Sequence, residues 1–339
     1  MTAPLLVTGL PRTGTSWVGK MLEASGEVVY VNEPMNPGHP PGRSPGVLNA
    51  SVTHQFQYIA PGNDDAWRRA FSDTLALRYR LGAEVRRNRG VYDLARAAKY
   101  VTAFTAGRLR GRRALIDDPF ALLSTSWLVQ EMGCQAVVLV RDPVSVVGSW
   151  RSLGWSVHFH ELLEQPDLVR DHLGPYVERM RSLIGSPDWL ARSCLLWELA
   201  YAVVDRAIAP LPGARINRYE DLVQAPLTGY RQLYADLGLT WSPQSRRRVE
   251  QATSGDASSR SAHSWSLVGG LSRTAYRPMA AGTALRSYQT RLTPAEIERV
   301  RELTAVVAAR FYPSATEEAR RDSAESISSR SAYGASSTR

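Results

Sequence analysis

The sequence has little cysteine, little lysine and no long apolar run. Only Cys134 and Cys194 occur among its 339 residues, so neither a disulfide framework nor a cysteine-based zinc site is expected. The six histidines are scattered without an HExxH pair, and no metal is expected. No apolar run approaches the roughly 18 residues of a membrane-spanning helix. The N-terminus lacks the basic start of a secretory signal. These absences predict a cytoplasmic protein without a transmembrane segment.

The charge that is present is mostly arginine. The chain has 41 basic and 32 acidic residues and a net charge of +9, and Lys20 and Lys99 are its only lysines, which leaves 39 arginines. The planar arginine fork suits phosphate and carboxylate groups. A basic surface therefore favours anionic partners, among them nucleotides, sulfated or phosphorylated molecules, nucleic acid and membrane head groups.

Short apolar runs separated by helical patterns predict an α/β fold with a central parallel sheet flanked by helices. The predicted strands are Leu5 to Thr8, Val28 to Val31, Ala114 to Ile116, Ala136 to Val140 and a short one at Ile216. Helices are expected at Ser16 to Ser25, Leu122 to Met132, Trp189 to Ala209, Thr293 to Phe311 and from Pro143 onward. Residues 1–313 are predicted to form one domain, with a helical cap insertion over 36–113, a long loop over 254–290 and a disordered tail over 314–339.

The sharpest motif is GLPRTGTSW, from Gly9 to Trp17, between the first strand and the first helix. Backbone N–H groups of such a loop and the helix N-terminus that follows bind phosphate. The nucleoside-triphosphate pattern G-x-x-x-x-G-K-[ST] places a lysine at position 15, where this chain has Thr15. Arg12 supplies the loop's cation instead, which argues against ordinary phosphoryl transfer.

This loop resembles that of the sulfotransferases that use 3′-phosphoadenosine-5′-phosphosulfate (PAPS), whose fold has P-loop, nucleotide-kinase-like architecture. Pro11 to Trp17 matches the family motif position by position. Trp17 aligns with a tryptophan that stacks on adenine in cytosolic members, although a core tryptophan explains it equally well. The resemblance implies that the 5′-phosphosulfate is bound by Arg12, Thr13, Gly14, Thr15 and Ser16.

Three further segments are similar to the family. Arg141 ends a buried strand and Ser149 follows eight residues later, as in the family's 3′-phosphate motif. Tyr219, in an R-Y-E-D-L segment, matches a tyrosine near the adenine, although the segment also reads as an ordinary helix start. Arg286 lies where relatives close a basic loop on the 3′-phosphate. The product would be 3′-phosphoadenosine 5′-phosphate (PAP).

The resemblance also implies a general base. Cytosolic members use a histidine near the position of Asp117 and Asp118, where this chain has none. Bacterial carbohydrate-type and tyrosylprotein-type members use a glutamate after the second strand, which matches Glu33. His39 and Asp118 are the alternatives. Asp117 stands where many relatives have a lysine that stabilises the leaving phosphate. Either Arg12 or another arginine replaces that lysine, or the acceptor step is slow or different.

The insertion over 36–113 combines aromatic residues with many arginines. It is either a helical cap with a solvated basic face or, together with the 254–290 loop, the wall of an acceptor cleft. The predicted activity is sulfuryl transfer from PAPS to a hydroxyl of a carbohydrate, glycolipid or small natural product, without nucleic acid as a partner. The alternatives are a P-loop small-molecule kinase and a non-enzymatic polyanion-binding protein.

Overall fold

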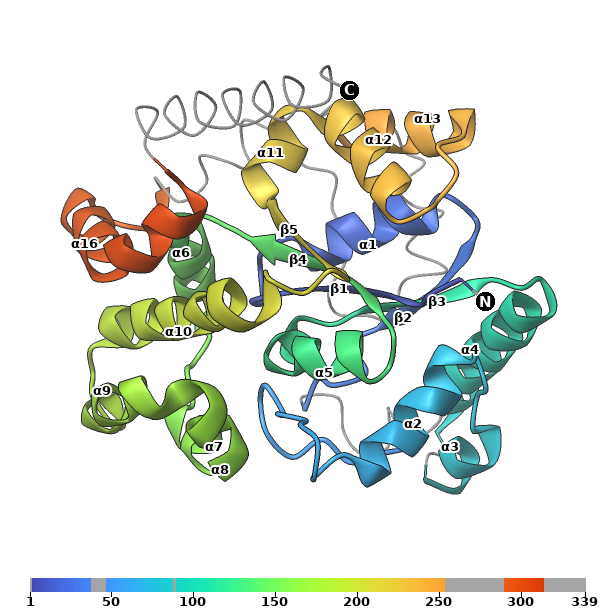
Figure 1. Cartoon of the computed structure of the whole chain (residues 1–339), viewed down its shortest axis with the longest axis horizontal. Helices are drawn as coiled ribbons and strands as arrows, with labels where there is room; N and C mark the ends of the chain where they lie inside the picture. Colours follow the sequence, from blue (N-terminus) through green and yellow to red (C-terminus); the bar gives the residue numbers. More distant parts are fainter. Residues whose placement is uncertain (1, 38–46, 88–89, 254–289, 314–339) are drawn as a thin grey trace, which may run out of the picture.

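The computed structural model describes residues 2–37, 47–87, 90–253 and 290–313. Five parallel strands form one sheet in the order β2-β3-β1-β4-β5 (Figure 1). The strands are β1 (Leu5–Gly9), β2 (Val28–Asn32), β3 (Arg113–Asp117), β4 (Gln135–Val140) and β5 (Ala214–Arg218). Each of the five predicted strands falls within one of these, and the predicted α/β fold with a central parallel sheet is confirmed.

The sheet is covered on both faces, and its central strands are buried along their whole length. Every residue of β1 and of β3 is buried. Side chains alternate between faces along a strand, and accordingly Leu5 and Val7 of β1 join one apolar cluster whereas Leu6 joins the other. The first cluster lies beneath α1 (Thr15–Glu23), α12 (Pro226–Asp236) and α13 (Pro243–Thr253).

The opposite face is packed by α5 (Thr125–Gln130) and α10 (Trp189–Val203), as Figure 1 shows. At one side of the sheet, α6 (Pro143–Leu153) and α16 (Pro294–Phe311) pack on each other and on α10. Thr293 and Glu296 form the predicted capping box of α16. The other elements are short: η1 (Pro119–Ser124), α7 (Phe159–Leu163), α8 (Pro166–Leu168), η2 (Val169–Leu173), η3 (Gly174–Tyr176), α9 (Val177–Leu183), η4 (Val204–Ile208) and α11 (Tyr219–Gln224).

Between β2 and β3 the chain forms the helices α2 (Asp65–Leu75), α3 (Leu81–Arg87) and α4 (Val91–Leu109). The helical pattern predicted to reach Arg113 ends at Leu109, and Arg113 begins β3. The guanidinium of Arg113 donates to the carbonyls of Ala3 and Leu237 and to the side chain of Gln135, which fixes this residue at the sheet.

Two predicted segments fall outside the described residues: the long loop, except for Thr290, and the 314–339 tail. Among the described residues, no helix combines the length and the apolar character needed to cross a membrane. Cys134 and Cys194 are both free and buried, and burial raises the pKa of each thiol to about 12.

Candidate active site

The loop between β1 and α1 turns sharply because two of its residues adopt the left-handed backbone conformation. Gly14 has φ 98° and Arg12 has φ 78°, a region that a non-glycine residue rarely occupies. The amide and the hydroxyl of Thr13 both donate to the Leu10 carbonyl, at 3.1 and 2.7 Å. A Cβ at Gly14 would lie 2.6 Å from ring carbons of Tyr219, so this position has no room for a side chain.

The loop and the second arginine motif are joined by direct hydrogen bonds. The Arg12 Nε donates to Ser149 Oγ at 3.1 Å, and Arg141 Nη1 donates to the Arg12 carbonyl at 2.9 Å. The Trp150 indole donates to the Pro11 carbonyl at 2.9 Å. Residues 137 positions apart in the chain are thus brought together at the carboxyl ends of β1 and β4, the edge where parallel α/β sheets bind ligands.

Positive charge gathers at this edge. Partial desolvation and the neighbouring charges of Arg141 and Arg291 lower the pKa of Arg12. The half-buried Arg291, immediately before α16, was not among the predicted site residues. The predicted Arg286 lies outside the described residues. The loop's own Arg12 is therefore influenced by guanidinium groups from two other segments, Arg141 after β4 and Arg291 before α16.

Aromatic rings line the same place. The Tyr219 ring, at the start of α11, lies 4.3 Å from the Arg141 guanidinium carbon. Trp17 contacts Tyr219 and Tyr230 edge-on, with ring centroids 5.9 and 5.4 Å apart. Trp17 is half-buried, so it belongs to the packing of α1 while keeping an accessible portion beside the loop. This position is compatible with both alternatives for Trp17, stacking on adenine and packing in the core.

Glu33 follows β2 directly and is the second non-glycine residue of the site in the left-handed region, with φ 42°. Its amide donates to the Asp117 carbonyl at 2.7 Å, and its Oε2 accepts from the Asn36 side chain at 2.6 Å. The residue is buried, 6% exposed, and burial raises its pKa to about 7, with the Asn36 hydrogen bond opposing the rise. A carboxyl that titrates near neutrality suits a general base.

Asp117 and Asp118 are both fully buried, and each accepts hydrogen bonds from neighbouring groups of the protein. Asp117 accepts a hydrogen bond from the Tyr30 hydroxyl. Burial raises the pKa of Asp117, and interactions with the side chains of Tyr30, Ser16 and Thr15 oppose the rise. Asp117 therefore lies next to the first turn of α1.

Asp118 has its two carboxylate oxygens engaged by backbone amides. Its Oδ2 accepts from the Met35 amide at 2.5 Å, and its Oδ1 accepts from the Phe120 amide at 2.9 Å. This arrangement caps η1 and leaves Asp118 poorly placed to accept a proton from a substrate. His39, the other alternative base, lies outside the described residues.

Among the described residues, one group of side chains that the sequence analysis did not single out could hold a metal ion. His158, His160 and Glu161 bring their ligand atoms within 4.8 Å of one another at the start of α7. Both histidines are exposed, and Glu161 Oε2 accepts a hydrogen bond from the Gln55 amide. In the sequence this group is visible as an H-x-H-E pattern, from His158 to Glu161, that spans the start of α7.

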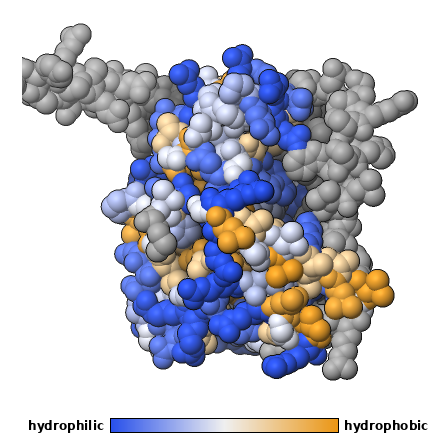
Figure 2. Space-filling model, turned by 90° about the vertical axis from the view of Figure 1, so that its right-hand side faces the viewer, coloured by the Kyte–Doolittle hydropathy of each residue, from blue (hydrophilic) through white to orange (hydrophobic). Residues whose placement is uncertain are grey.

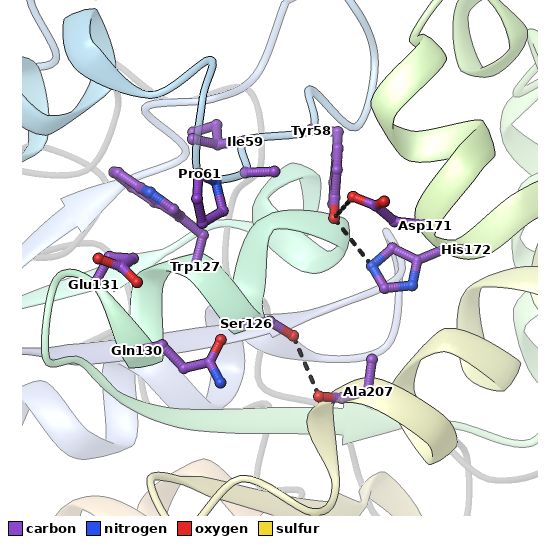
Figure 3. Close-up of a pocket in the computed structure, with 11 residues that line it drawn as sticks. Tyr58, Ile59, Pro61, Ser126, Trp127, Gln130, Glu131, Asp171, His172 and Ala207 are labelled. Atoms are coloured by element: carbon purple, nitrogen blue, oxygen red, sulfur yellow. Dashed lines mark hydrogen bonds between the residues drawn. The ribbon is translucent and has the colours of Figure 1, made fainter.

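A cavity of about 290 Å³ lies elsewhere, between α5, the segment over 58–61 and η2 (Figure 3). At one end the Tyr58 hydroxyl donates to Asp171 Oδ2 at 3.0 Å and lies 3.2 Å from His172 Nε2. None of the predicted site residues lines this cavity. Its hydrogen bonds connect the segment before α2 to η2.

No protein-family model and no curated protein matches the chain. Solved structures similar to it include the sulfotransferase domain from the curacin biosynthetic pathway, with 15% identity, a TM-score of 0.43 and coverage of 89% of this chain and 97% of that one. A sulfotransferase from Mycobacterium avium shows 15% identity and a TM-score of 0.39, with 92% and 77% covered. A mouse sulfotransferase complexed with PAP shows 12% identity and a TM-score of 0.38, with 96% and 89% covered.

Proposed function

We propose that this protein is a PAPS-dependent sulfotransferase of the bacterial carbohydrate or tyrosylprotein type. One observation carries the proposal: Arg12 of the phosphate loop donates to Ser149 and accepts from Arg141 through its carbonyl. The two motifs predicted to bind opposite ends of PAPS thus form one connected site. A kinase loop would need a lysine at the position of Thr15, and a general polyanion-binding surface would not need this connection.

The residues present fit a doubly phosphorylated adenosine. The loop from Thr13 to Ser16 would bind the 5′-phosphosulfate: Thr13 holds the turn through its two hydrogen bonds to the Leu10 carbonyl, and Gly14, Thr15 and Ser16 supply backbone amides at the N-terminus of α1. Arg141, Ser149 and Arg286 would bind the 3′-phosphate, and Arg291, whose charge acts on Arg12, is a further cation near the loop. Trp17 and Tyr219 would lie beside the adenine; Trp17 is half-buried, and Tyr219 is buried next to Gly14 and Arg141. The guanidinium groups provide the positive charge that Asp117 cannot, so we expect no requirement for a metal.

The chemistry assigned to the chain's own residues is in-line transfer. Glu33 accepts the proton of the acceptor hydroxyl as that oxygen forms its bond to sulfur. The bond between sulfur and the bridging phosphate oxygen breaks, and PAP leaves with the electron pair. Arg12 and the loop amides stabilise the negative charge that grows on the bridging oxygen.

The acceptor is a hydroxyl of a carbohydrate, glycolipid or small natural product. Residues 1–313 would form the whole catalytic unit, with the 36–113 insertion beside the acceptor. A reducing compartment such as the cytoplasm suits two buried free cysteines.

Calorimetry with PAP tests the co-substrate before any acceptor is known. We expect wild type to bind PAP without magnesium, and Arg141→Ala to bind at least roughly tenfold more weakly, since hydrogen bonds to charged groups contribute about 1.5–3 kcal/mol. Arg181→Ala is the matched control, because Arg181 is an exposed arginine that pairs with Glu178 on its own helix.

Three outcomes would contradict the proposal. Failure of PAP to bind removes it outright. Magnesium-dependent binding of ATP in place of PAP would favour the kinase alternative. Salt-sensitive binding that Arg141→Ala and Arg181→Ala weaken equally would indicate a general polyanion-binding surface.

A further inference from the structure

We propose that helices α3 and α4 form a docking surface for an anionic lipid bilayer. This surface, called the cap face below, consists of the exposed apolar residues Leu81, Val85, Val91, Leu94 and Leu109 and the cations on and beside the same two helices. None of its residues belongs to the phosphate loop or to the other proposed co-substrate-binding residues, so its test does not depend on PAPS binding.

Apolar exposure is concentrated on the cap face. Of the eight large apolar residues that are exposed among the described residues, five lie on these two helices. Val91 is 87% exposed and Leu109 is 80% exposed, at opposite ends of α4. Figure 2 views this side of the molecule and shows apolar residues gathered toward its lower part, with hydrophilic residues around them. Exposed apolar residues concentrated on one part of a surface mark an interaction site.

Nearly all of the chain's net charge lies in the same segment. Residues 78–112 contain ten basic and two acidic residues, a net charge of +8, against +9 for the whole chain. The two acidic residues, Glu84 and Asp93, both pair with the buried Arg96. The outward charge of α3 and α4 is therefore cationic. The exposed cations of the cap face are Arg78, Arg86, Lys99, Arg108 and Arg110.

An anionic bilayer matches both features. Aliphatic side chains enter the boundary between head groups and acyl chains, while arginines bind anionic head groups. Nucleic acid fits less well, because strands are bound by stacking on aromatic rings, and the exposed residues named here are aliphatic. A second copy of the chain also fits less well, since a symmetric contact would place like charges against each other.

Co-sedimentation of the full chain with vesicles tests the proposal. We expect binding to vesicles of phosphatidylcholine and phosphatidylserine, and little binding to phosphatidylcholine alone. The double variant Val91→Ser, Leu94→Ser should bind the anionic vesicles roughly tenfold more weakly, because each apolar group withdrawn from the bilayer reduces affinity. Arg86→Gln and Arg108→Gln should each weaken binding about fivefold, as expected for one cation near an anionic surface.

Val306→Ser is the matched control, because Val306 is 84% exposed on α16, away from the cap face. Circular dichroism checks that each variant is folded. Equal binding of wild type to neutral and anionic vesicles would overturn the proposal, as would unchanged binding of the serine double variant, which would indicate a purely electrostatic polyanion surface. A dimer that the double variant dissociates, without vesicle binding by wild type, would assign the surface to a second copy.

Discussion

The strand-end site and the cap face use arginine in opposite ways. At the strand ends, Arg12 and Arg141 are held by specific hydrogen bonds to Ser149 and to a backbone carbonyl. On the cap face, most arginines project from helix surfaces among exposed aliphatic residues. At the site, the role of each guanidinium therefore depends on its position and its hydrogen-bond partners. On the cap face, the total positive charge matters more than the position of any one arginine.

The largest expected difference between the site and the cap comes from substituting one buried glutamate in each. Glu33 at the site is 6% exposed, and Glu84 in the cap is 1% exposed and paired with Arg96. Glu33→Gln should lower kcat by about 10²–10⁴-fold, the contribution of a general base. Its affinity for PAP should stay unchanged. The measurement is transfer of labelled sulfate from PAPS, with acceptor in excess.

Glu84→Gln is the control for that experiment. Loss of one partner of a buried ion pair costs about 3–5 kcal/mol of folding free energy, so this variant should be less stable. Its kcat per folded molecule should match wild type. A full rate in Glu33→Gln, or an equal loss of rate in both variants, would move the base elsewhere.

A pair of glycines gives the next largest contrast. Gly14 has φ 98° and a Tyr219 ring against it, whereas Gly82 in α3 has nothing within 4 Å of an added Cβ. Gly14→Ala should lower the free energy of unfolding by roughly 2–5 kcal/mol, from backbone strain and overpacking together. Gly82→Ala should raise it by about 0.5–1 kcal/mol, because alanine favours a helix. Urea unfolding measures both. Similar effects of the two substitutions would mean that the loop tolerates a side chain.

Much of the fold follows from sequence because most of the strands contain short apolar runs, which are typical of a parallel sheet covered on both faces. The loop from Gly9 to Trp17 and the pair Arg141 and Ser149 were equally visible, since their spacing is local. The structure adds that these two motifs meet.

What could not be predicted depends on contacts between distant segments. The burial of Asp117 next to the first turn of α1 and the capture of Asp118 by two amides follow from the packing of β3 against β1 and β2, which no local pattern encodes. The proximity of Arg291 to Arg12 depends on where the chain returns before α16. Helices α7 to α9 are too short to show a clear periodicity.

The smallest of the three expected effects is the pH dependence of the free energy of unfolding. We expect it from Glu33 at the site and not from Glu84 in the cap. Burial raises the pKa of Glu33 from 4.5 to about 7, so the folded state binds a proton that the unfolded state releases. Its contribution to stability is complete below the unfolded pKa and is lost as pH rises through about 7, a change of up to about 3 kcal/mol.

The activity should change in the opposite direction: kcat/KM should rise through the same pH interval, because only the ionised carboxylate accepts a proton. Glu33→Gln cannot ionise, so relative to wild type it should gain unfolding free energy between about pH 5 and pH 8, measured in urea. Glu84→Gln should show no such pH-dependent gain. If the free energies of unfolding of Glu33→Gln and wild type followed parallel curves against pH, Glu33 would be ionised throughout this range, and burial would not raise its pKa.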